Sequence, residues 1–324
     1  MRAPLAGAIA AAGLLALTVP AFADDPDAAP CITPSCEFAV AATRDGQLLV
    51  VDAEDGGVHR HLVHHTPPTN ADRGAPIDAI SLSPSRTEVY YSAQDWDDGG
   101  RDIYRIGIEG GEPELVVEDA LAPAVSPDGR FLAYSFSPDH HSGSTTIAIR
   151  TLATGEERHF GPGGEPEQKW GAVGDITWAP DATRIAFTYD YEGVELRLLD
   201  LLSGTADWSG ARNLGPYRSP SWNGDGLFAT EWCCFPGHAE VRGEVVRFDP
   251  ATGEFSLRST DGGMILDEPE VYGVDVRDGY GSDLLVVRQN SVEGGFAGTS
   301  GALDRIDTDG SVRRLGAGYA VAAW

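Results

Sequence analysis

The stretch AVSPDGRFLAYSF at residues 124–136 joins a β-turn signal, Ser-Pro-Asp-Gly, to an apolar strand. The same order recurs in TWAPDATRIAFTY at 177–189, and weaker copies stand at 83–92 and 223–230. A repeat of about 40–50 residues that carries four short strands is typical of a β-propeller. The sequence therefore predicts an all-β fold.

The spacing of these copies predicts six blades, each with four antiparallel strands. The segment EFAVAATRDGQLLVVDAEDGGVHRHLV at 37–63 supplies only three strands of its blade. The sequence ends in LGAGYAVAAW, which puts Trp324 in the place that Trp178 and Trp222 hold in their repeats. We therefore expect the C-terminal strand to complete the first blade and to remove an open sheet edge.

These repeats resemble those of TolB-type (WD40-like) propellers, in which a strand ending in Trp-Ser-Pro-Asp-Gly precedes an apolar strand and a Tyr-containing strand. The segments TWAPDATRIAFTYDYEGVELRLLDLLSG (177–204), AVSPDGRFLAYS (124–135) and DIYRIGIEGGE (102–112) carry the resemblance. It implies the propeller alone, because the α/β N-terminal domain of TolB has no counterpart in this pattern.

Three segments are expected along the chain. Residues 1–23 read as a secretory signal peptide with an Ala21-Phe22-Ala23 cleavage site, residues 24–36 as an acidic, Pro-rich segment, and residues 37–324 as one propeller domain. We expect a secreted or periplasmic, extracytoplasmic protein without stable membrane insertion after cleavage, because no later stretch is apolar enough to cross a bilayer.

The chain is acidic, with a formal net charge of −27 at pH 7. This charge repels phosphate backbones and anionic lipid surfaces, so we expect no nucleic acid partner. A protein or peptide of basic character is the expected partner, and the protein itself is expected to be a monomer.

Four cysteines fit an oxidising compartment. Cys31 and Cys36 bracket a tight loop, and Cys233 and Cys234 are adjacent. Three pairings are possible, of which two local disulfides are favoured because the strand layout separates the two pairs.

The longest connections all fall on one face of the predicted propeller, between the second and third strands of a blade or between successive blades. Long loops on one face mark the expected functional side. Aromatic side chains in these loops are the expected anchors for a partner: Trp96, Trp170, Tyr191, Trp232 and Phe235.

Metal sites are weaker expectations. Asp95, Asp97 and Asp98 form an acidic loop that could hold Ca²⁺, although its order departs from the EF-hand pattern. Histidines could converge on the same face and suit Zn²⁺ or Cu²⁺: His64, His65, His140, His141 and His238. No other cofactor is expected.

No catalytic set stands out. Asp128 of the Ser-Pro-Asp-Gly turn is expected to accept backbone N–H bonds, and the tryptophans at 178, 222 and 324 are expected to pack between blades. A Gly-x-Ser-x-Gly elbow is absent from the sequence. We therefore favour a non-catalytic binding scaffold. The alternatives are a metal-dependent hydrolase or lyase of lactonase type, with its site at the channel mouth, and a carbohydrate-binding propeller.

Overall fold

The computed structural model describes residues 37–65, 75–94, 100–137, 146–162, 171–204, 207–208, 210–223, 226–231, 245–249, 255–257, 271–276, 283–288, 301–307 and 311–324. Backbone contacts divide the chain into Met1–Cys31 and Ile32–Trp324, and all described residues belong to the second unit. The predicted signal peptide and acidic segment lie outside the described residues. In the described part of the chain, no helix has the length and apolar character needed to span a bilayer.

The described residues form five antiparallel sheets. Four of them hold four consecutive strands each. One sheet holds β4 (Ile77–Leu82), β5 (Glu88–Gln94), β6 (Arg101–Gly107) and β7 (Glu114–Val117), and the next holds β8 (Ala120–Val125), β9 (Phe131–Phe136), β10 (Thr146–Thr151) and β11 (Glu157–Phe160). The third holds β12 (Ala172–Trp178), β13 (Arg184–Asp190), β14 (Val194–Asp200) and β15 (Arg212–Gly215), and the fourth holds β16 (Tyr217–Asn223), β17 (Gly226–Glu231), β18 (Val245–Phe248) and β19 (Phe255–Leu257).

The fifth sheet has seven strands in the order β20-β21-β22-β23-β1-β2-β3. Their bounds are β1 (Phe38–Thr43), β2 (Gln47–Asp52), β3 (Val58–His64), β20 (Val271–Val276), β21 (Leu284–Arg288), β22 (Gly301–Ile306) and β23 (Val312–Ala323).

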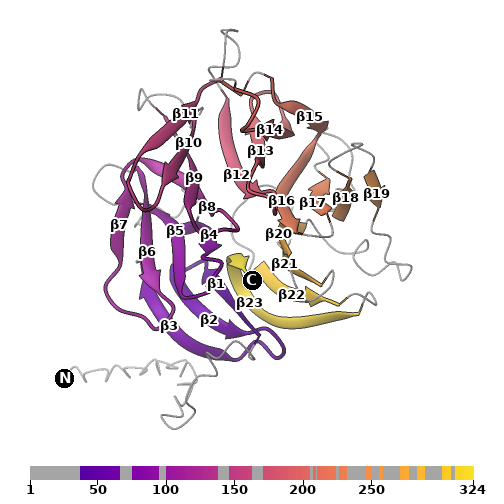
Figure 1. The fold of residues 1–324 in the computed structure, drawn as a ribbon. Coiled ribbons are helices and arrows are strands. Elements are labelled where there is room, and N and C mark those ends of the chain that lie inside the picture. Colours follow the sequence, from indigo (N-terminus) through magenta and orange to yellow (C-terminus); the bar gives the residue numbers. More distant parts are fainter. Residues whose placement is uncertain are drawn as a thin grey trace, which may run out of the picture. The chain divides into compact units, whose positions relative to one another are not determined.

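The sheets follow one another around a common centre. β4 contacts β8, β8 contacts β12, β12 contacts β16, β16 contacts β20, β20 contacts β23, and β23 contacts β4. Figure 1 shows these strands on the inside, with β7, β11, β15 and β19 toward the outside. This is a β-propeller arrangement, as the repeat predicts.

Buried side chains fill the space between neighbouring sheets. Val40 of β1, Ile77 of β4 and Tyr91 of β5 share one core cluster and are 0% exposed. The predicted inter-blade tryptophans behave as expected: Trp178 is buried against the preceding sheet and donates from Nε1 to Ala124 O over 2.8 Å, and Trp222 is also buried. These clusters explain why middle strands such as β9 and β13 read as nearly unbroken apolar runs, since both of their faces are covered.

The Ser-Pro-Asp-Gly turn between β8 and β9 is a structural element, as predicted. Asp128 Oδ1 accepts hydrogen bonds from Ser126 Oγ (2.7 Å) and from the backbone N–H of Arg130 (3.0 Å). Gly129 closes the turn with a φ of +70°, a value that glycine adopts without a steric penalty. In the copy between β12 and β13, Ala182 stands at the glycine's place with a φ of +55°.

Ala182→Gly is therefore expected to raise the free energy of unfolding by about 0.5 to 1 kcal/mol, because relief of the left-handed strain outweighs the added entropy of the unfolded chain. Urea unfolding measures the change. The matched control is Gly129→Ala, whose Cβ would meet no atom closer than 3.8 Å and so tests backbone strain alone. Equal stability of all three proteins would contradict this explanation.

The number of sheets differs from the prediction of six separate four-stranded blades, which is wrong on this point. β23 runs unbroken through Gly316 and Gly318, where the sequence suggested a break between two strands. Its first part pairs with β22, for example Ile306 with Val312, and its last part pairs with β1, for example Val40 with Ala323. One continuous strand thus joins two strand groups into a single sheet.

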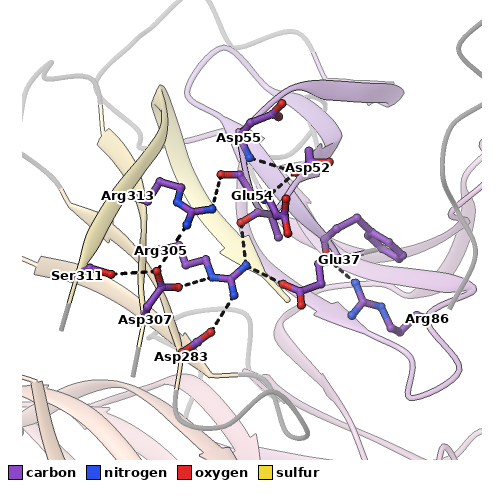
Figure 2. Close-up of polar contacts among 12 residues, drawn as sticks. Glu37, Asp52, Glu54, Asp55, Arg86, Asp283, Arg305, Asp307, Ser311 and Arg313 are labelled. Atoms are coloured by element: carbon purple, nitrogen blue, oxygen red, sulfur yellow. Dashed lines mark hydrogen bonds and ion pairs between the residues drawn. The ribbon is translucent and has the colours of Figure 1, made fainter. Parts of the chain in front are cut away.

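A polar cluster around Arg305 of β22 ties this sheet together (Figure 2). Its guanidinium contacts Glu37 Oε2 at 2.6 Å, Asp283 Oδ2 at 2.8 Å and Asp307 Oδ1 at 2.8 Å. The same group lies 4.8 Å from the ring centre of Trp324. The cluster therefore connects residues before β1, before β21 and after β22 with the residue that follows β23.

Candidate functional site

The inner strands share an irregularity near their first residues. Each shows a register shift against the second strand of its sheet, at Ile77/Ala79 in β4, Leu121/Ala124 in β8, Val173/Ile176 in β12 and Arg218/Ser221 in β16. Ala122 and Ser219 have positive φ values there, +55° and +48°. Such bulges re-aim side chains, and here they lie next to a cavity.

A cavity of about 220 Å³ lies between the inner strands. Its lining changes along the strands. Asp78 is the second residue of β4 and Asp175 is the middle residue of β12, whereas Leu82 and Trp178 end the same strands. At about 3.3 Å per residue, three or four residues separate the acidic from the apolar level by roughly 10–13 Å.

The acidic level lies at a defined end of the sheets. Ala172 at the start of β12 pairs with Asp190 at the end of β13, next to the connection at 191–193. We call this the loop end: it carries the connections between second and third strands and those between successive sheets. Connections here, such as 161–171 and 232–244, are longer than the turns 126–130 and 179–183 at the opposite, turn end.

Asp78 is held by neighbours from two strands behind it. Ser92 Oγ donates a hydrogen bond to Asp78 Oδ1 over 2.5 Å, and Arg101 Nη1 lies 3.1 Å from Asp78 Oδ2. Burial raises the pKa of Asp78 above its ordinary value, and the opposing effects of Arg101 and Ser92 are smaller. The side chain is still 33% exposed, because its free surface faces the cavity.

Asp175 faces the same cavity. Burial raises its pKa, and the nearby charge of Asp78 raises it further, while Arg218 and the backbone N–H of Ser219 act in the opposite direction. The Asp175 side chain is exposed, because it forms part of the cavity wall. The negative charges of the two carboxylates therefore repel each other.

Asp175→Asn is expected to raise the melting temperature at pH 7. The folded protein binds more protons than the unfolded chain between the ordinary pKa of 3.8 and the raised value, so stability falls as pH rises through that window. Asparagine removes this loss, and a gain on the order of 2 °C is expected for a domain of this size. The gain should shrink as the pH falls toward 4, because both carboxyls then take up protons.

Thermal unfolding followed from pH 4 to pH 8 tests this expectation. The matched control is Asp190→Asn, which removes the same charge from the exposed end of β13. If Asp175→Asn and the parent have the same melting temperature at pH 7, or if the difference between them grows on acidification, the assigned repulsion between Asp78 and Asp175 is refuted.

Of the binding residues predicted from sequence, Tyr191 is described. It lies in the connection between β13 and β14 at the loop end and is 44% exposed. The others lie outside the described residues: Trp96, Trp170, Trp232 and Phe235. The cysteines at 31, 36, 233 and 234, and the acidic residues Asp95, Asp97 and Asp98, also lie outside them.

The described histidines have ordinary polar contacts. His64 Nε2 lies 3.1 Å from Asp45 O, and His65 Nε2 lies 3.2 Å from the hydroxyl of Tyr91. Within the described ranges, no group of three His, Cys, Asp or Glu side chains could hold a metal ion. His140, His141 and His238 fall outside those ranges.

Sequence reasoning missed Asp78 and Asp175. The available signal was a carboxylate within each of two inner strands, in IDAISL (77–82) and GDITW (174–178), among residues that are otherwise mostly small or apolar. A charge at a position expected to be buried indicates either a partner or a site.

The fold is a β-propeller with a cavity between its inner strands. The chain is 32% identical over 132 residues to the Protein TolB homolog of Chlorobium chlorochromatii (strain CaD3), and the match covers 40% of this chain and 27% of that relative. It is 28% identical over 112 residues to the Protein TolB homolog of Chlorobaculum tepidum, covering 34% and 24%. The matches thus span about a quarter of the curated relatives' length. No family model matches the chain.

Solved structures share the fold. TolB from Acinetobacter baumannii superposes with a TM-score of 0.61 at 16% identity, covering 89% of this chain and 65% of that chain. A chain from a nidogen/laminin complex gives a TM-score of 0.57 at 12% identity, covering 89% and 98%. Puromycin hydrolase gives 0.50 at 20% identity, covering 85% and 42%. These likenesses support a TolB-type propeller, as the repeats predicted.

Proposed function

We propose that this propeller is a non-catalytic scaffold that binds a protein or peptide partner through its loop end. The observation that carries the proposal is the acidic level of the central cavity, which lies at the same end as the long connections and the exposed ring of Tyr191. Aromatic anchors beside charged groups are the usual composition of a binding hot spot. The neighbour from the nidogen/laminin complex illustrates a propeller in a protein complex, whereas puromycin hydrolase is an enzyme, so the fold alone does not decide.

We also propose that β23 closes the ring, because it pairs with β22 on one side and with β1 on the other. Support comes from the succession of contacts from β4 through β8, β12, β16 and β20 to β23 and back to β4.

The expected partner is basic, since the chain carries a net charge of −27 and the cavity presents two carboxylates. Complementary charge mainly raises the rate at which two proteins associate, and salt weakens this attraction. Secretion, the two local disulfides and a Ca²⁺ site at Asp95, Asp97 and Asp98 stay predictions. Mass analysis of the mature protein and elemental analysis would test them.

Tyr191→Ala is expected to reduce recovery of the partner from the culture supernatant by about tenfold, as loss of an aromatic anchor commonly does. Quantitative pull-down with purified variants measures the effect. The control is Leu202→Ala, which removes another exposed apolar side chain (75% exposed) after β14, at the turn end. Equal losses for both variants, or none for Tyr191→Ala, would count against the loop end.

A further inference from the structure

We propose that the acidic level of the central cavity binds one alkylammonium group, the side chain of a lysine that the partner presents. This inference rests on the proposed partner binding at the loop end and specifies what the partner inserts there.

The cavity wall presents two carboxylates, and the arginines that act on them are not part of that wall. Asp78 and Asp175 line it, whereas Arg101 and Arg218 do not. Arg101 reaches Asp78 from β6, and Arg218 of β16 acts on Asp175. A cation entering the cavity would therefore meet carboxylates first and relieve the repulsion between them.

A buried acceptor beside the start of β4 has no hydrogen-bond partner among the described residues. Ser92 already donates its hydroxyl hydrogen to Asp78. Gln94 lies two residues further along β5, on the same face as Ser92, and is 7% exposed. Its Oε1 is buried without a hydrogen-bond partner among the described residues. A ligand with N–H donors is suited to pair with such an oxygen.

The occupied oxygens favour an ammonium over a guanidinium. Asp78 Oδ1 accepts from Ser92, and Asp78 Oδ2 faces Arg101. A guanidinium prefers both oxygens of one carboxylate for its planar fork, whereas an ammonium needs only one lone pair from each of several acceptors. Ser81 and Thr177 also line the cavity, and Ser81 Oγ accepts a hydrogen bond from the backbone N–H of Val125 over 3.0 Å.

The size and the wall fit an aliphatic stem. The cavity of about 220 Å³ exceeds the ~150 Å³ that accommodates benzene and lies below the ~300 Å³ at which pockets for drug-sized ligands begin. Ala124, Pro123 and Ala322 give its wall an apolar, small-residue character. A four-carbon chain can lie along this wall while its charged end reaches the carboxylates.

Saturation-transfer NMR with n-butylammonium as the probe tests the proposal on the full-length protein. A dissociation constant on the order of 1–10 mM is expected for so small a ligand. The neutral analogue n-butanol should bind at least about tenfold more weakly, since a charge-assisted bond is lost. Asp175→Asn should weaken n-butylammonium by about tenfold, and Asp190→Asn should leave it unchanged.

Several results would overturn the inference: equal binding of n-butanol, unchanged binding to Asp175→Asn, tighter binding of n-butylguanidinium, or displacement of the probe by micromolar CaCl₂. Because the asparagine variant is expected to be at least as stable as the parent, loss of binding would not reflect misfolding. The probe needs no partner. If n-butylammonium does not bind but Tyr191→Ala still reduces recovery of the partner, the lysine site alone is refuted. If n-butylammonium binds but the pull-down recovers no partner, the proposed function is refuted.

Discussion

A chain that lacks residues 318–324 is expected to lose its cooperative unfolding transition and to aggregate. This deletion removes the part of β23 that pairs with β1, where Thr43 meets Tyr319 and Val40 meets Ala323. It also removes Tyr319 and Trp324 from a core cluster that includes Leu303. The exposed edge of β1 would then be free to pair with other molecules. Circular dichroism during heating and size-exclusion chromatography measure both effects.

A point variant separates loss of packing from loss of the strand. Trp324→Ala leaves the backbone pairing in place and is expected to cost about 3–5 kcal/mol of unfolding free energy, the usual range for a buried aromatic side chain. Leu202→Ala, at a 75% exposed position, should change it by less than about 0.5 kcal/mol. A truncated protein that unfolds at the parent's temperature would refute the closing role of β23.

Arg305→Met is the second large effect that we expect, a loss of about 3–5 kcal/mol. The Arg305 side chain is 11% exposed and faces Glu37, Asp283 and Asp307. Methionine keeps much of the stem's volume but leaves three carboxylates without their shared cation. Arg305→Lys should recover only part of the loss, because one ammonium cannot reproduce three separately directed N–H contacts.

Equilibrium urea unfolding at pH 7 measures these losses. Arg60→Met is the control, because Arg60 pairs with Glu109, whose side chain is 67% exposed, and such surface pairs contribute less than about 1 kcal/mol. If Arg305→Met costs no more than Arg60→Met, the cluster in Figure 2 does not hold the seven-stranded sheet together.

The fold could be predicted from sequence to a large extent because its information is local and repeated. The Ser126–Gly129 turn and its copy at Asp181 specify tight connections through their own side chains, whatever the neighbouring sheets do. Buried tryptophans at equivalent positions, Trp178 and Trp222, marked the ends of inner strands. Each of these signals lies within a few residues of the feature that it predicts.

Other features depend on contacts between distant segments. Six separate blades would need two strands in the C-terminal segment, but pairing with β22 on one side and β1 on the other keeps β23 continuous. Asp78 and Asp175 lie 97 positions apart, yet both line one cavity, and each lies at a register shift of its strand. The sequence marks each carboxylate as unusual within an inner strand, but propensity and periodicity do not show that the two line one cavity.

Site-specific photo-crosslinking tests the proposed binding at the loop end most directly. A photoreactive p-benzoylphenylalanine is placed at position 191, at the loop end, or at position 202, at the turn end, two exposed positions at opposite ends of β14. The proposal predicts discrete protein adducts from position 191 that fade in about 0.5 M salt, where charges are screened within a few ångströms, and none from position 202. Equal adducts from both positions, or adducts from position 202 alone, would contradict it.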